Sequence, residues 1–186
     1  MGKKVTVDSA HLFNKGLEVI EAHHLFGFPY EDIHVVIHPQ SIVHSLVRLL
    51  DGSLLAHLGP ADMRLPLMSA LYYPGMEEFP WGRLDLIEAG PLEFHPMDEA
   101  RFPAFRLAVE SAREGGTAPA VLNAADETAV DAFLAGRIGF LEIIDWIEET
   151  LDAHRRVPVS RIEDVLEADR WARRFLSERH AEATLE

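Results

Sequence analysis

The sequence predicts an α/β (α+β) portion with a small mixed sheet, followed by an all-α four-helix bundle. Short β-prone runs alternate with helical patterns in the first part, and the pattern is helical throughout from residue 102 onward. Between the two parts, residues 74–103 hold five prolines and three glycines, which is typical of an extended segment. We therefore divide the chain into an α/β portion at 1–73, a connector at 74–103 and a helical bundle at 104–186.

The α/β portion begins with residues 3–7, which are rich in β-branched side chains and predict a short strand. Asp8 and Ser9 are good N-caps for a helix that runs to residue 26 and is ended by Gly27. The other expected elements of this portion are a strand at 33–37 buried on both faces, a hairpin of strands 42–50 and 54–58 turned by Asp51-Gly52, and a helix at 63–73.

The bundle is predicted from four amphipathic patterns separated by short loops. The expected helices span 104–113, 119–135, 140–154 and a last one that begins within 160–164 and runs to about 179. Near the start of the second helix, Asn123 is interpreted as a cap, with Asp126 and Glu127 favourable in its first turn.

The net charge of −14 argues against nucleic acid and anionic membrane surfaces as general partners. No apolar run approaches the roughly 18 residues that a membrane span needs. The chain has no cysteine, which removes disulfides and thiolate metal sites and agrees with a cytoplasmic location. Against this acidic background, all three lysines, Lys3, Lys4 and Lys15, fall within the first fifteen residues, and such a positive cluster suggests an anion-binding site.

Four polar residues in this N-terminal stretch have two interpretations. In the first, Ser9 caps a helix and Lys15 forms an ordinary surface pair with Glu18 at i,i+3. In the second, Ser9 and Asn14 donate hydrogen bonds to a phosphate at the helix N-terminus, Lys15 adds a positive charge, and Glu18 binds a divalent metal or acts as a base. Spacing alone favours the first interpretation.

The histidines offer a weaker metal hypothesis. His34 and His38 have the same strand parity, and His44 and His57 lie in neighbouring strands, so a metal pair is geometrically allowed. Nothing in the spacing fixes it, and a hydrogen-bonded structural role is the preferred interpretation for each of them.

Longer motifs carry more information than periodicity. They are Met1-Gly-Lys-Lys-Val-Thr-Val-Asp-Ser-Ala10, Asn14-Lys-Gly-Leu-Glu18, Val35-Val-Ile-His-Pro-Gln-Ser-Ile-Val-His-Ser45, Asp51-Gly-Ser-Leu-Leu-Ala-His-Leu-Gly59, Asp62-Met-Arg-Leu-Pro66 and Leu122-Asn-Ala-Ala-Asp-Glu127. In this order they closely resemble the C-terminal half of 1-deoxy-D-xylulose 5-phosphate reductoisomerases, over essentially the whole chain. These NADPH-dependent enzymes make 2-C-methyl-D-erythritol 4-phosphate for non-mevalonate isoprenoid biosynthesis.

The resemblance implies that residues 1–73 are the rear part of a catalytic domain. It implies that Ser9, Asn14, Lys15, Glu18 and Met63 contact the phosphorylated sugar substrate. Lys15 and Glu18 would be catalytic, and Glu18 would also be a ligand of Mg²⁺, Mn²⁺ or Co²⁺.

The resemblance further places His44 near the site and leaves Gly2 as the single candidate for a cofactor contact. His11 and His24 stand where the family usually has Thr and Trp, and no role is assigned to either. The family also implies a homodimer.

Because the resemblance covers only the C-terminal half of the family, the NADPH-binding domain is expected to lie outside the chain, and the chain alone is expected to be inactive. An alternative is a dimerisation or phosphate-binding module without catalysis, suggested by the β-prone edge at Leu54–Leu58. A third and weaker hypothesis is a zinc hydrolase built on histidines.

Overall fold

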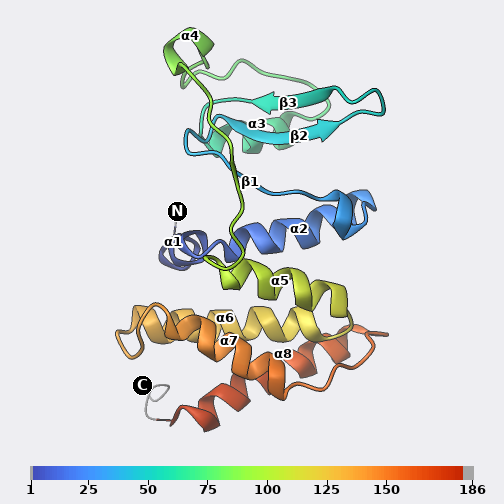
Figure 1. Ribbon diagram of the computed structural model, residues 1–186, viewed down its shortest axis with the longest axis vertical. Helices are drawn as coiled ribbons and strands as arrows, with labels where there is room; N and C mark the ends of the chain where they lie inside the picture. The colour runs from blue at the N-terminus through green and yellow to red at the C-terminus, as the bar shows by residue number, and fades with distance from the viewer. Residues whose placement is uncertain (1, 182–186) are drawn as a thin grey trace. The chain divides into compact units, whose positions relative to one another are not determined.

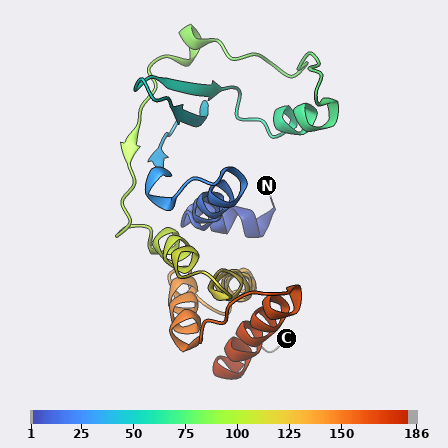
Figure 2. The ribbon, with the colours of Figure 1, turned by 90° about the vertical axis from the view of Figure 1, so that its right-hand side faces the viewer.

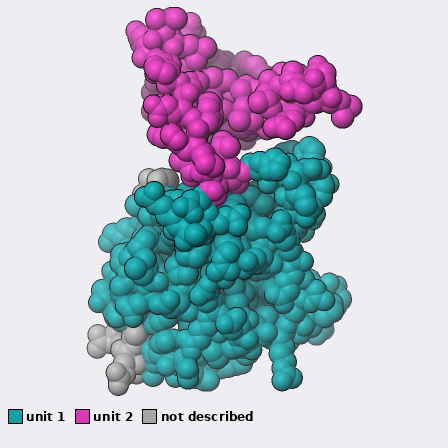
Figure 3. Space-filling model, viewed as in Figure 1, with its two compact units in different colours: residues 1–34, 98–186 teal, residues 35–97 magenta. Residues whose placement is uncertain are grey.

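The computed structural model describes residues 2–181 of the chain. The fold divides into two compact units, shown in Figure 3. We call residues 1–34 and 98–186 the helical unit, and residues 35–97 the strand unit. The predicted fold class, an α/β portion followed by a helical bundle, is confirmed.

The bundle of the helical unit consists of four helices, drawn from yellow-green to red in Figures 1 and 2. They are α5 (Pro103–Glu114), α6 (Ala118–Leu134), α7 (Glu142–Ala153) and α8 (Ile162–Arg179). Each lies within a few residues of its predicted position, because the amphipathic periodicity of this part is strong.

Helix α6 is the central element, since it packs against α1, α5, α7 and α8. Its many alanines make this possible: Ala124, Ala125 and Ala129 are completely buried and let the neighbouring helices come close. The largest fully buried side chains of the helical unit include Phe13, Leu122, Ile143, Ile147 and Leu176.

The start of the chain is helical, so the strand predicted at residues 3–7 is wrong. Helix α1 (Lys3–Ala10) precedes α2 (Phe13–Phe26), and the single predicted helix is broken at Leu12, which has a left-handed φ of 61°. Asp8 and Ser9 are therefore not N-caps but members of α1, and Asp8 is buried. Packing of α1 on α6 buries Val7 and Asp8, and this tertiary gain overrides the β propensity of the segment.

A glycine allows α2 to pack closely on α5. A Cβ atom added at Gly16 would lie 2.4 Å from the Cβ of Ala108 on α5, closer than two such atoms can approach. The glycine in the Asn14–Glu18 motif therefore has a packing role, and it fixes the helix that carries the candidate site residues against the bundle.

The strand unit contains the expected hairpin. Strands β2 (Val43–Arg48) and β3 (Leu54–Leu58) pair antiparallel, and the side chain of Asp51 accepts hydrogen bonds from Ser53 in the turn. Helix α3 (Arg64–Tyr72) follows, as predicted.

The strand predicted at 33–37 is much shorter in the structure. Only β1 (Val36–Ile37) forms, paired with β4 (His95–Pro96) of the connector, and a 3-10 turn, η1 (Tyr30–Asp32), precedes it. Val36 is 46% exposed, so this strand is not buried on both faces as expected. The small sheet is thus two separate two-stranded antiparallel sheets within the described residues.

The connector at 74–103 is not wholly extended, since it also contains the short helix α4 (Leu86–Ala89), capped by Asp85. The boundaries of the two compact units differ from the predicted boundaries, because helices α1 and α2 pack on the bundle. The division at 73 and 103 stays a prediction about the domains of a longer protein. Among the described residues, no helix is long and apolar enough to cross a membrane.

Candidate functional site

The turn between α1 and α2 brings two of the predicted site residues into direct contact. The Asn14 side chain donates from Nδ2 to the hydroxyl of Ser9 at 3.0 Å, and the Ser9 hydroxyl donates to the carbonyl of Val5 at 2.7 Å. Both side chains are partly exposed. The left-handed Leu12 produces this contact, because it turns the chain so that the first turn of α2 faces the end of α1.

The other two predicted residues form an ion pair on the next turn of α2. The Lys15 ammonium lies 2.5 Å from Oε2 of Glu18, and both side chains are substantially exposed. The surface pair of the first interpretation is therefore present. Such an exposed pair is worth only about 0.2–1 kcal/mol, so little energy opposes its opening toward a ligand.

All four residues line one surface cavity of about 440 Å³, which we call the N-terminal cavity. Its wall also includes Glu21, which the sequence interpretation missed. Glu21 lies three residues after Glu18 on the same helix face, and this i,i+3 spacing was the available signal. The cavity therefore presents two carboxylates, one ammonium, one amide and one hydroxyl to solvent.

The N-terminus of α2 opens next to these side chains. Its N-cap is Leu12, and no side chain caps the helix. Uncapped backbone N–H groups and the helix dipole favour an anion at this position. A helix N-terminus therefore lies beside the residues predicted to bind phosphate. This helix begins at Phe13 and not, as predicted, at Ser9.

Two further predicted residues belong to the strand unit. Met63 precedes α3 and is 71% exposed. His44 lies on β2, where its Nε2 atom is 3.2 Å from the carbonyl oxygen of Gly59. Gly2, the candidate for a cofactor contact, is the exposed N-cap of α1.

Two of the strand-region histidines, His38 and His44, hydrogen-bond backbone carbonyl groups. His38 hydrogen-bonds the carbonyl of Glu93 and stacks on Phe94. Within residues 2–181, none of the four strand-region histidines belongs to a group of three side chains that could share a metal ion. The hydrogen bonds of His38 and His44 agree with the structural role that we preferred for these two residues.

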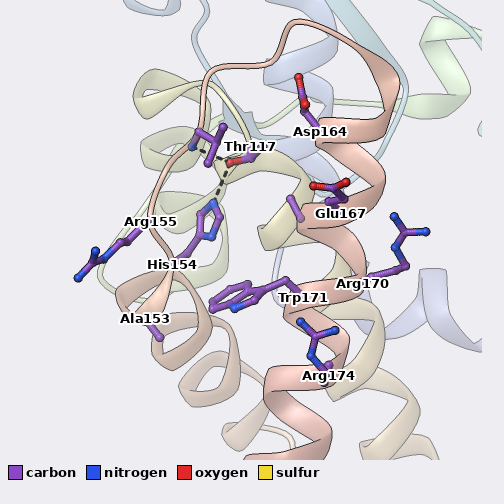
Figure 4. A pocket seen from close by; sticks show the side chains of 11 residues that line it. Thr117, Ala153, His154, Arg155, Asp164, Glu167, Arg170, Trp171 and Arg174 are labelled. Atoms are coloured by element: carbon purple, nitrogen blue, oxygen red, sulfur yellow. Dashed lines mark hydrogen bonds between the residues drawn. The ribbon is translucent and has the colours of Figure 1, made fainter.

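A second cavity, of about 550 Å³, lies in the bundle where α6 begins and α7 ends (Figure 4). There His154 hydrogen-bonds Thr117 at 2.8 Å and packs beside Trp171. Burial lowers the pKa of His154, so the neutral imidazole is favoured. None of the predicted site residues lines this cavity.

Comparison with known proteins identifies the family. A family model described as the DXP reductoisomerase C-terminal domain matches residues 58–175. The chain belongs to the 1-deoxy-D-xylulose 5-phosphate reductoisomerase family. A second model, the 1-deoxy-D-xylulose 5-phosphate reductoisomerase C-terminal domain, matches residues 1–26, which include the four polar residues of the N-terminal cavity.

Individual reductoisomerases agree with this assignment. The chain is 50% identical over 186 residues to the reductoisomerase of Synechococcus sp. (strain CC9902), and 54% identical over 182 residues to that of Gloeobacter violaceus. These alignments cover 99% and 96% of the chain but 45% and 46% of the relatives. The chain therefore spans slightly less than half the length of these relatives.

Solved reductoisomerase structures share the fold. The Zymomonas mobilis enzyme in complex with NADPH superposes with a TM-score of 0.86 at 48% identity, covering 91% of this chain and 45% of that one. A reductoisomerase in complex with NADPH, fosmidomycin and magnesium superposes with a TM-score of 0.88 at 41% identity, covering 96% of this chain and 46% of that one.

Proposed function

We propose that this chain is the C-terminal, substrate- and metal-holding part of an NADPH-dependent 1-deoxy-D-xylulose 5-phosphate reductoisomerase. The reaction is a metal-assisted rearrangement of the carbon skeleton followed by hydride reduction. The observation that carries the proposal is the N-terminal cavity. Ser9, Asn14, Lys15 and Glu18 come from two helices and line it together.

In this proposal, the phosphate of the substrate binds at the N-terminus of α2. Lys15 leaves Glu18 and supplies a positive charge, while Asn14 and Ser9 donate hydrogen bonds to phosphate or hydroxyl oxygens. Holding the phosphate fixes the position of the reacting carbons, and this positioning is a large part of the catalytic effect. Met63 would line the pocket of the assembled enzyme.

The residues of the cavity fit a divalent metal. Glu18 and Glu21 offer carboxylate oxygens, the donors that Mg²⁺ and Mn²⁺ prefer. We assign Glu18 as the protein ligand from this chain. When bound, the ion supplies Lewis-acid polarisation of the α-hydroxyketone oxygens. Two carboxylates are few for such an ion, so further ligands are expected from substrate or from another part of the enzyme.

The described residues do not fit NADPH binding. Their sheets are two-stranded and antiparallel, unlike the parallel sheet on which dinucleotides usually bind. Gly2 is the only contact with the cofactor that we propose from this chain. We therefore propose that the chain by itself does not turn over substrate. We also propose, because the sequence has no cysteine, that its enzyme acts in the cytoplasm.

The activity can be tested in a chimera that joins this chain to the N-terminal part of the Gloeobacter violaceus enzyme. NADPH oxidation that depends on 1-deoxy-D-xylulose 5-phosphate and Mn²⁺ is expected from the chimera and not from the chain alone. Glu18→Gln in the chimera should abolish turnover while NADPH binding, followed by fluorescence, is unchanged. A chimera that binds NADPH but has no activity would contradict the proposal, and turnover by the chain alone would contradict its inactivity.

The phosphate contact can be tested on the chain itself by calorimetric titration with the substrate. Lys15→Met removes a charge-assisted hydrogen bond worth about 1.5–3 kcal/mol, so binding should weaken roughly 10- to 150-fold. Lys3→Met is the matched control, because Lys3 is exposed and does not line the cavity. Equal effects of the two substitutions would show that only net charge matters.

We also propose that the protein forms a homodimer through the hairpin of the strand unit. Val47 and Leu55 are paired neighbours on β2 and β3 and are 50% and 61% exposed, while Leu46 is 41% exposed. Apolar residues exposed on paired strands are typical of a surface that another chain covers. The alternative function, a dimerisation module without catalysis, predicts the same association but no activity in the chimera.

A further inference from the structure

A cluster of four ionisable side chains lies where α1 packs on α6, outside the N-terminal cavity. The ammonium of Lys4 donates to Oδ2 of Asp8 at 2.7 Å and to Oδ2 of Asp126 at 2.8 Å. His11, at the end of α1, completes the cluster. The expected cap at Asn123 and the expected first-turn role of Asp126 are wrong, because α6 begins at Ala118 and Asp126 lies in its buried middle.

Three members of this cluster are almost completely buried. Asp8, His11 and Asp126 are 1%, 4% and 0% exposed. Among the residues that the structure describes, Oδ1 of each aspartate and both ring nitrogens of His11 have no hydrogen-bond partner. Leaving a buried polar group without a partner costs about 1–3 kcal/mol, so four such atoms in one place call for a binding partner.

The His11 ring is held in this position by aromatic neighbours. Its centroid is 6.1 Å from that of Phe13, in an edge-on arrangement, and 5.7 Å from that of Phe140. The ring is also almost completely buried. One of its nitrogens lies within 4.8 Å of a carboxylate oxygen of both Asp8 and Asp126.

Two carboxylates share the single ammonium of Lys4, so the cluster carries an excess negative charge when both aspartates are ionised. Desolvation raises the pKa of Asp126 to about 7, so this excess charge is complete only above neutral pH. Burial also lowers the pKa of His11. A neutral imidazole and ionisable carboxylates are the forms that bind metal ions, and metal binding displaces any remaining proton.

We propose that Asp8, His11 and Asp126 form a binding site for a divalent transition-metal ion such as Zn²⁺. One ligand atom from each residue lies within 4.8 Å of the others. Tetrahedral ligands at 2.0–2.1 Å from zinc are about 3.3 Å apart, so small side-chain rotations close the site. One imidazole and two carboxylates suit a borderline ion such as Zn²⁺ better than Mg²⁺ or Ca²⁺.

Lys4 acts as the competitor of the ion at this site. Its side chain is 31% exposed, so it can turn toward solvent when a divalent cation binds both aspartates. The site is separate from the metal site proposed at Glu18, which lies on α2 and lines the N-terminal cavity. A bound ion would link α1, the helix that carries Ser9, to the bundle helix α6.

The test is direct metal binding to the 186-residue chain, with no activity measurement. The chain is treated with a chelator and titrated with Zn²⁺ by calorimetry. A parallel titration with Co²⁺ is followed by visible absorption, which reports the coordination geometry. One tightly bound equivalent of either ion is expected at the cluster, together with a higher melting temperature of the zinc-loaded chain.

Two ligand variants should lose this binding. His11→Phe removes both nitrogens but keeps an aromatic ring between Phe13 and Phe140, and it is therefore expected to fold. Asp126→Asn is the second ligand variant. Each should weaken zinc binding by more than about 100-fold, since even loss of groups outside the ligand shell costs roughly 10- to 100-fold. Circular dichroism checks that each variant is folded.

Two control variants complete the test. Lys4→Met removes the competing charge and should make zinc binding several-fold tighter. Glu163→Gln, which removes an exposed carboxylate on α8, should leave zinc binding unchanged. The proposal is overturned if the chain binds no zinc, or if a folded His11→Phe variant binds as tightly as the wild type.

Discussion

At the scale of single residues, close packing explains a glycine that the motif alone leaves unexplained. Gly16 lies between Asn14 and Glu18 in sequence, and Ala108 of α5 occupies the space that a Cβ atom on Gly16 would need. The residue therefore controls where the cavity-lining helix sits on the bundle. A residue of this motif can therefore be needed for helix packing without contacting a ligand.

Gly16→Ala should destabilise the protein. Overpacking costs about 1–3 kcal/mol, while alanine gains only ~1 kcal/mol in helix propensity, so a net loss of up to about 2 kcal/mol is expected in urea unfolding followed by circular dichroism. Gly2→Ala is the control, because a Cβ atom added at Gly2 would have no atom within 4 Å and its φ of −68° suits alanine. The pair Gly16→Ala with Ala108→Gly should recover stability, and failure to do so would argue against this contact.

Asp164 provides a residue-scale prediction about pH. Its carboxylate accepts hydrogen bonds from the backbone and hydroxyl groups of Ser160 and from the Arg161 backbone at the start of α8. The hydrogen bonds from Ser160 lower its pKa from 3.8 to about 2. The folded state therefore binds fewer protons than the unfolded state between these values, so this stabilisation is complete above pH 3.8 and is lost as the pH falls toward 2.

Asp164→Asn should lower the melting temperature by a few degrees at pH 7, where the wild-type carboxylate is ionised. The difference from the wild type should become smaller between about pH 4 and about pH 2. Glu163→Gln, at the neighbouring exposed position, should show no such pH dependence. A difference between Asp164→Asn and the wild type that stays constant across the whole range would show that the carboxylate charge is not involved.

At the scale of elements, ion pairs connect helices that the sequence does not show to be neighbours. Arg173 on α8 pairs with Glu127 on α6 and, at 3.0 Å, with Asp169 on its own helix. Those carboxylates raise the pKa of the Arg173 guanidinium further. Glu127 is thus part of a contact between helices and does not serve as a first-turn charge.

Arg173→Met should destabilise the bundle by about 0.5–1 kcal/mol, because half-exposed ion pairs contribute little and the methionine keeps the apolar stem. Arg174→Met is the matched control at the next position, where the side chain is exposed and a change within about ±0.5 kcal/mol is expected. Urea unfolding of both variants provides the measurement. Equal losses for both would mean that general charge balance, not the α6–α8 contact, is responsible.

At the scale of the whole molecule, the two units differ in how they bury apolar side chains. The helical unit encloses a core of fully buried residues, whereas the strand unit has exposed apolar side chains on both strands of its hairpin. A two-stranded hairpin alone is marginally stable in water. The strand unit is therefore the part of the chain that would gain most in the proposed dimer.

Light scattering of the chain in solution should show a dimer whose dissociation increases with Leu55→Lys, since a charge on the hairpin face opposes burial. Leu141→Lys is the control, because Leu141 is 75% exposed at the start of α7 in the helical unit. A strict monomer at high protein concentration would contradict the dimer proposal. Equal effects of the two substitutions would place the interface elsewhere.

The sequence by itself determined the features that depend on neighbouring residues. The four bundle helices follow from apolar periodicity, and the hairpin at Leu54–Leu58 follows from its Asp51-Gly52 turn. The grouping of Ser9, Asn14, Lys15 and Glu18 was also predicted, because these residues are close in the chain and one turn suffices to bring them together.

Only the tertiary structure decided the features that depend on distant residues. Residues 3–10 are helical because α6 buries Val7 and Asp8, and Asp126 is a buried partner of Lys4 because α1 packs on the middle of its helix. No local pattern reports a contact across 122 residues. Burial changes both the preferred backbone conformation and the protonation of the groups involved, and burial is a property of the folded chain as a whole.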